Sequence, residues 1–170
     1  MVENKTYKID LKAIVGDCHR ESFILDDAYF ADSEKIETDG GYVEATVDIT
    51  KTAGVFDVQI ELKGKIKTIC DRCLDELICP VDTSAHLMVK LGEEYEEESE
   101  DIITIPEKEA TLDLSWLLYE FVELSLPMKK VHPESECNQD MIDKLYDFGE
   151  EDAPKDPRWA ELSKLKDKLS

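Results

Sequence analysis

Alternating apolar and polar residues run from Val58 to Leu91, and this pattern constrains the fold more than any other feature of the chain. Successive side chains of a β-strand point to opposite faces of its sheet, so the pattern predicts two long strands, each with one buried face. Between them lies a tight turn, Cys70-Asp71-Arg72-Cys73. The apolar phase comprises Val58, Ile60, Leu62, Ile66 and Cys70 before the turn, and Leu77, Cys79, Val81, Ala85, Leu87, Val89 and Leu91 after it.

Other strands are predicted on both sides of this hairpin. Thr6 to Val15 alternates as a first strand, and Val43 to Thr50 gives the cleanest alternation in the chain. Residues 16–30 show no clear period, so we predict a loop with a short irregular element there. Ile102 to Ile105 predicts a short strand that Pro106 stops. Gly64 lies inside a long predicted strand, where a glycine often marks a bulge.

The C-terminal third carries helix signals. Leu112 to Leu126 is mostly apolar and predicts a helix that Pro127 ends. Asn138 is a good N-cap for a second, short helix that Gly149 closes, and Asp156-Pro157 starts a third helix with an apolar stripe. In the first helix, the side chains expected to pack on the sheet are Trp116, Leu117, Phe121 and Leu124.

The order of these elements, strands first and helices last, predicts an α+β fold. We expect an antiparallel, strongly curved β-sheet built around the long hairpin, with the C-terminal helices packed against it. Residues 1–150 would form a single domain. Residues 151–170 would form a linker and a C-terminal amphipathic helix docked on the same domain.

The charge of the chain is unusual. Its 170 residues include 41 acidic and 20 basic side chains, which gives a net charge of −21. Such a surface repels phosphate backbones and attracts basic partners, although solubility alone would also explain it. The densest acidic run predicts a solvated, mobile loop and a candidate partner-binding surface. Its acids are Glu93, Glu94, Glu96, Glu97, Glu98, Glu100 and Asp101.

The cysteines provide the candidate metal ligands. Cys70 and Cys73 form a C-x-x-C pair, and two thiolates at this spacing can bind one tetrahedral zinc ion. His132 and Cys137 offer the other half of a structural Cys3His zinc site, and Cys18-His19 is a reserve pair. The competing interpretations are a reduced dithiol that caps the hairpin, a redox couple, and a simple core position for Cys70.

Catalytic motifs are not evident. The sequence contains neither a nucleophile elbow nor a glycine-rich phosphate loop, so we predict a protein that is not an enzyme. A zinc-dependent enzyme is one alternative. Direct binding of RNA is another, and its contacts would be the lysines of the C-terminal helix together with Lys63, Lys65, Lys67 and Arg72. These cations could instead face the acidic surplus of the protein itself, including the run from Glu93 to Asp101.

Three sequence features together resemble the bacterial YceD family of large ribosomal RNA subunit accumulation proteins. They are Cys70-Asp71-Arg72-Cys73-Leu74 on a strand, Leu126-Pro127 followed by Val131-His132 and Cys137, and the Asp156-Pro157-Arg158 helix. The resemblance implies a role in accumulation or assembly of the large ribosomal subunit, without established catalytic activity.

The acidic composition adds a hypothesis to this resemblance. The partner would be a basic ribosomal protein of the large subunit, which the acidic run covers until RNA displaces it. The sequence contains no apolar stretch long enough to span a membrane, and no basic segment followed by an apolar stretch opens it. We therefore expect a cytoplasmic protein with no membrane partner.

Overall fold

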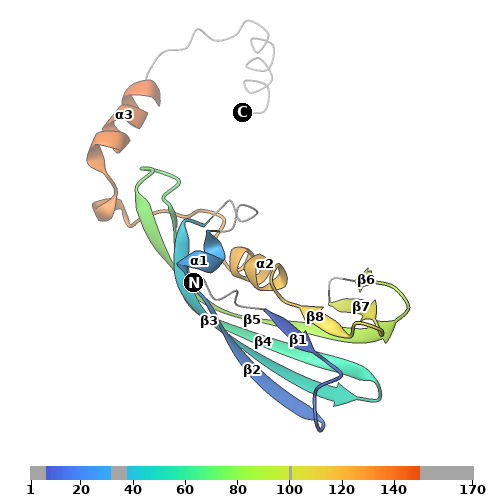
Figure 1. Ribbon diagram of the computed structural model, residues 1–170. Helices are drawn as coiled ribbons and strands as arrows, with labels where there is room; N and C mark the ends of the chain where they lie inside the picture. The colour runs from blue at the N-terminus through green and yellow to red at the C-terminus, as the bar shows by residue number, and fades with distance from the viewer. Residues whose placement is uncertain (1–6, 32–37, 100, 150–170) are drawn as a thin grey trace, which may run out of the picture.

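Three long antiparallel strands form the centre of the protein. They are β3 (Gly40–Thr52), β4 (Val55–Ile69) and β5 (Glu76–Gly92), and they pair in that order. The structure is a computed structural model that describes residues 7–31, 38–99 and 101–149 (Figure 1). The β4–β5 ladder runs from Val55 opposite Lys90 to Ile69 opposite Glu76. The two alternating strands predicted on either side of the cysteine turn are therefore present.

The sheet is completed by shorter strands on both sides. Its order is β2-β3-β4-β5-β7-β6, and it is open. Strand β2 (Cys18–Leu25) pairs antiparallel with β3, and β7 (Ile102–Pro106) lies parallel to β5. Strand β6 (Glu96–Ser99) pairs antiparallel with β7 at the edge. The sheet is therefore mainly antiparallel, as predicted, while its strong curvature stays a prediction.

Most of the remaining elements lie on one face of this sheet, whereas the last helix extends away from the sheet beside the cysteine turn and, contrary to the prediction, is not packed on it (Figure 1). Strands β1 (Lys8–Asp10) and β8 (Thr111–Asp113) form a two-stranded antiparallel sheet. The helices are α1 (Asp27–Phe30), α2 (Leu117–Leu124), the 3-10 turn η1 (Glu134–Glu136) and α3 (Gln139–Gly149). The inward phase of the central strands is buried against the β1–β8 pair and α2, through residues that include Ile9, Leu112, Leu118 and Val122. This arrangement confirms the α+β class.

Two predicted loops are wrong, because both segments contain strands. Residues 16–30 contain all of β2, in which only Phe23 and Leu25 are fully buried. The acidic run contains β6, in which Glu98 accepts hydrogen bonds from Lys90 Nζ (2.7 Å) and Thr104 Oγ1 (2.8 Å). Opposite charge and backbone pairing with β7 thus hold a strand in place despite the repulsion between its glutamates.

The first predicted helix is shorter and rotated. Leu112 and Leu114 alternate with Asp113 around strand β8, and the helix begins only at Leu117. The helix buries Leu118, Tyr119 and Val122. Of the four side chains predicted to pack on the sheet, Leu117 and Phe121 are partly buried against the core, whereas Trp116 and Leu124 are exposed. The second predicted helix matches α3. The predicted C-terminal helix after Asp156 and the docking of residues 151–170 lie outside the described residues.

Gly64 has a different role from the predicted bulge. The pairing of β4 with β3 and with β5 continues through it without a register shift. A Cβ atom at this position would lie 2.2 Å from the Tyr42 carbonyl oxygen and 2.6 Å from Val43 Cα. The glycine is therefore required by the close approach of two backbones.

We expect Gly64→Ala to lower the free energy of unfolding by about 3 kcal/mol or more, because the methyl group meets backbone atoms that cannot rotate away. Urea unfolding would measure the loss as a lower midpoint. Gln59→Ala, at an exposed position of the same strand, is the control and should change the midpoint little. Equal midpoints for both variants would contradict this account of Gly64.

Candidate metal centre

The turn between β4 and β5 brings the first two candidate ligands together. The Cys70 N–H donates to the Asp75 carbonyl (2.9 Å), and the Leu74 N–H donates to the Cys70 carbonyl (2.9 Å). Leu74 adopts a positive φ of 63°, which allows the chain to reverse. We call residues 70–75 the knuckle. Cys70 and Cys73 are both buried in it, although the knuckle itself projects from the end of the sheet (Figure 1).

The segment after α2 brings the other two ligands to the knuckle. The Asp71 N–H donates to the Lys130 carbonyl, and the Lys130 N–H donates to Asp71 Oδ2, both at 2.7 Å. These reciprocal bonds fix the chain two residues before His132. Cys137 then lies buried between the knuckle and the start of α3, together with Met141 and Ile142. A residue of the C-x-x-C motif that is not itself a ligand therefore positions the distant half of the site.

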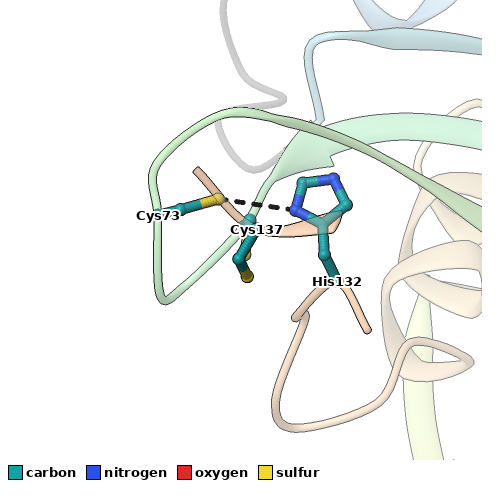
Figure 2. Close-up of side chains that lie close together, drawn as sticks. Cys73, His132 and Cys137 are labelled. Carbon is teal, nitrogen blue, oxygen red and sulfur yellow. Dashed lines mark hydrogen bonds between the residues drawn. The ribbon is translucent and has the colours of Figure 1, made fainter. Parts of the chain in front are cut away.

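The four predicted ligands converge. One side-chain ligand atom from each of Cys70, Cys73, His132 and Cys137 lies within 4.8 Å of the other three. Figure 2 shows Cys73 Sγ facing His132 Nδ1 at 3.4 Å, with Cys137 beside them. Three sulfurs and one imidazole nitrogen are the donor set of a tetrahedral structural site for a soft or borderline metal ion. The cluster could therefore hold a metal.

A second hydrogen bond selects the imidazole nitrogen that faces the sulfurs. His132 Nε2 lies 3.0 Å from the Glu76 carbonyl oxygen, which can only accept a hydrogen bond. Nε2 therefore carries the proton, and in the neutral ring the lone pair of Nδ1 points into the cluster. Metal-binding histidines are commonly oriented by such a bond to a backbone carbonyl. Figure 2 shows the resulting position of the ring.

Backbone N–H groups favour thiolates at the two knuckle cysteines. Burial acts to raise the pKa of Cys70, but hydrogen bonds from backbone N–H groups, including that of Cys73, lower this pKa to about 6. The Asn138 N–H is the main cause of the lowered pKa of Cys73. Burial and the neighbouring sulfurs raise the pKa of Cys137 to about 11. Two of the three sulfurs are thus prepared to carry the negative charge that metal binding requires.

The other cysteines and histidines do not join this cluster. Cys79 is buried in the core, as predicted, and Cys18 is exposed on β2. The reserve pair Cys18-His19 is placed on β2, where His19 lies 3.4 Å from Glu21. His86 pairs instead with Asp57 at 2.9 Å on the open face of the sheet.

The predicted RNA contacts lie near the knuckle, on the open face of the sheet. Lys63, Lys65 and Lys67 point outward from β4, and Arg72 is half-buried in the knuckle. Lys63 pairs with Glu61 (3.4 Å) and Lys67 with Asp27 (3.5 Å). Lys63 and Lys67 thus meet acids of the protein itself, although not those of the run from Glu93 to Asp101. Sequence reasoning missed the positioning roles of Asp71, Lys130 and Glu76, for which the sequence carries no distinct signal.

The predicted partner-binding acids lie around β6. Glu93, Glu94, Glu96 and Glu97 are exposed, and Glu97 accepts a hydrogen bond from the Tyr95 hydroxyl (2.7 Å). Asp101 is also exposed, and its backbone carbonyl accepts a hydrogen bond from the Met88 N–H. Glu100 lies outside the described residues. The acids therefore form a surface at the opposite end of β5 from the knuckle (Figure 1).

The fold and the cluster define an α+β protein with a four-ligand cysteine–histidine site at the end of an open, mainly antiparallel sheet. The family model described as "Large ribosomal RNA subunit accumulation protein YceD" matches residues 58–166. The chain therefore belongs to the YceD family, and the match includes all four clustered ligands. Neither the curated proteins nor the solved structures contain a match to the chain. No helix in the described part of the chain is long and apolar enough to cross a membrane.

Asp71→Ala should release the segment that carries His132 and Cys137, because it removes the acceptor of the Lys130 N–H. A lost hydrogen bond to a charged group is worth about 1.5 kcal/mol or more, so we expect Cys137 of the metal-free, reduced protein to react with a thiol reagent roughly ten times faster. Mass spectrometry of labelled peptides would measure this rate. Asp75→Ala removes the same charge from the same knuckle and should leave the rate nearly unchanged. Equal acceleration in both variants would contradict the positioning role.

Proposed function

We propose that this protein is a non-enzymatic factor in accumulation of the large ribosomal subunit, and that it binds a basic ribosomal protein through the acidic surface around β6. Membership of the YceD family supports the connection with the large ribosomal subunit. The observation that carries the choice of partner is the edge position of β6, whose four residues are all exposed. A concentrated negative surface attracts a basic protein and repels the RNA backbone.

In this mechanism the acidic surface shields the positive charge of the ribosomal protein before assembly. The surface of Glu93, Glu94 and Glu96 would contact the partner, whereas Glu98 is occupied by Lys90 and Thr104. Ribosomal RNA carries a much denser negative charge, so it would displace the factor when the protein reaches its binding site. Exchange of one anionic surface for another needs no catalytic group.

The metal centre would serve the scaffold. We propose that Cys70, Cys73, His132 and Cys137 bind one structural zinc ion. With four protein ligands the coordination of zinc is complete, so the site would have no open position for a substrate. The ion would link the β4–β5 hairpin to the segment between α2 and α3, and its binding energy would stabilise that connection.

Neutralising the acids around β6 should remove the basic partner. Affinity capture from native lysate would compare the unchanged protein with a variant that carries Glu93→Gln, Glu94→Gln and Glu96→Gln. We expect a basic large-subunit protein in the first capture and at least ten-fold less of it in the second, because the attraction depends on the concentrated charge. Nuclease treatment should not reduce the recovery.

The matched control removes the same number of charges elsewhere. Glu136→Gln, Asp143→Asn and Asp147→Asn change exposed acids of η1 and α3, at the far side of the molecule from β6 (Figure 1). This variant should capture the partner as well as the unchanged protein does. Equal capture by all three proteins would remove β6 from the mechanism. Recovery of nuclease-sensitive RNA without a ribosomal protein would favour the direct RNA-binding alternative.

Zinc should bind the purified, reduced protein at one ion per chain and raise its melting temperature, because the ion binds only the folded cluster tightly. Elemental analysis and thermal unfolding with and without a chelator would measure both effects. We expect Cys73→Ser and His132→Ala to lose the bound ion and the stabilisation. Cys18→Ser, which changes the exposed cysteine of β2, should keep both. Loss of zinc from Cys18→Ser as well, or no stoichiometric zinc in the unchanged protein, would contradict the site.

A further inference from the structure

The open face of the sheet is divided into two unlike halves. Far from the knuckle, its outward side chains are mainly polar, among them Thr46, Asp48, Gln59, Ser84 and His86. Near the knuckle, large apolar side chains point outward instead. Tyr42 is 53% exposed, Ile69 47% and Ile78 57%. Apolar side chains at neighbouring exposed positions are typical of a surface that another molecule covers.

These apolar side chains are contiguous in the sheet. Tyr42 on β3 and Pro80 on β5 lie directly opposite Lys65 on β4. Ile78 lies opposite Lys67, one step closer to the knuckle, and Ile69 follows on β4. Outward neighbours along a strand are about 6.6 Å apart, so one extended surface contains them all. We call Tyr42, Lys65, Ile69, Ile78 and Pro80 the knuckle patch.

A small hollow adjoins the patch. Its volume is about 180 Å³, and Ile69 and Leu74 line it together with Thr68, Asp71 and Lys130. Leu74 is 63% exposed at the tip of the knuckle. A patch that ends in a hollow can receive a projecting side chain, and such anchored side chains contribute much of the binding energy at protein interfaces.

The charge at the centre of the patch is positive. Lys65 has no ion-pair partner among residues 7–31, 38–99 and 101–149, and it lies between Tyr42 and Pro80. This arrangement is unusual in a chain whose acids outnumber its bases by 41 to 20. A carboxylate placed over Lys65 would form an ion pair with it. The apolar neighbours would exclude water from this pair, and the lower local dielectric constant would strengthen the attraction.

We propose that the knuckle patch binds a segment of a partner protein that presents apolar side chains together with a carboxylate, and that the carboxylate pairs with Lys65. The apolar side chains would cover Ile69 and Ile78, and one of them would enter the hollow beside Leu74. This interaction is separate from the proposed binding of a basic protein, because β6 and the knuckle lie at opposite ends of β5 (Figure 1). An experiment can therefore refute either binding proposal without refuting the other.

The shape of these side chains favours protein over RNA. Single-stranded RNA is held by stacking of its bases on aromatic rings or guanidinium planes. The branched side chains of Ile69, Leu74 and Ile78 offer no flat surface for stacking, and Tyr42 is the one aromatic ring of the knuckle patch. In addition, Lys63 lies directly between Glu44 and Asp82 in the sheet, and these carboxylates repel a row of phosphates that would continue along β4 from Lys65.

Site-specific photo-crosslinking in the native cells would identify the occupant. A photoreactive residue replaces Ile78 in the full chain, and the matched control places it at Ser84, three outward positions further along the same face of β5. We expect position 78, and not position 84, to crosslink a protein segment rich in apolar side chains and Asp or Glu. Crosslinks to RNA or to a second copy at position 78, no crosslink, or the same products at both positions would overturn the proposal.

A synthetic peptide of the crosslinked segment then tests the chemistry. Ile78→Asp and Lys65→Glu should each weaken peptide binding at least ten-fold in calorimetry, while Ser84→Asp leaves it unchanged. All three positions are exposed, so equal melting temperatures would show that the variants fold. A peptide whose acid is replaced by Lys should bind Lys65→Glu more tightly than the original peptide does. Unchanged affinity in Ile78→Asp and Lys65→Glu, or no rescue by the charge exchange, would overturn the proposal.

Discussion

The two hydrogen bonds between Asp71 and Lys130 join the halves of the molecule on which the site depends. Residue 71 belongs to a hairpin turn, and residue 130 follows a helix 59 positions later in the chain. Each residue donates its backbone N–H to the other, once to a carbonyl and once to a carboxylate. This pairing satisfies backbone groups in a turn where no strand or helix can do so. It also places His132 and Cys137 against the C-x-x-C pair without the help of a metal ion.

The rigid part of this arrangement is the sheet. Alternation along β3, β4 and β5 buries one face of each strand, and a shift of register by one residue would expose the whole apolar set. The register therefore holds the knuckle at a fixed distance from the core. Gly64 allows β3 and β4 to approach closely within the same ladder. Local strain at the knuckle, such as the positive φ of Leu74, is tolerated because the strands on either side are already fixed.

The sequence predicted the long strands and the four clustered ligands because each depends on a short-range signal. Period-two alternation specified β3, β4 and β5. Cysteine and histidine are rare in this chain, so the four residues that could share one metal site could be chosen from their ligand chemistry alone. Strand β2 escaped prediction because residues 18–22 are polar or partly exposed on both faces, with burial confined to Phe23 and Leu25. Strand β6 escaped because its stability comes from β7, Lys90 and Thr104, which no local pattern reveals. The buried face of α2 depends on its rotation over the sheet, which the pattern of apolar residues in the helix did not specify.

The separation between the knuckle and β6 decides how the two charged surfaces interact. Lys65 lies opposite Pro80 of β5, and β7 joins β6 to the same strand from Met88 onward, eight residues further along, which corresponds to roughly 26 Å. At physiological ionic strength, charges are screened over about 8 Å. The negative field around β6 therefore does not reach Lys65 through solvent, and a positive patch can persist in a chain of net charge −21. The acidic surface around β6 and the knuckle patch thus lie near opposite ends of one continuous strand. Each can contact another molecule without an electrostatic effect on the other, while the sheet fixes the distance between them.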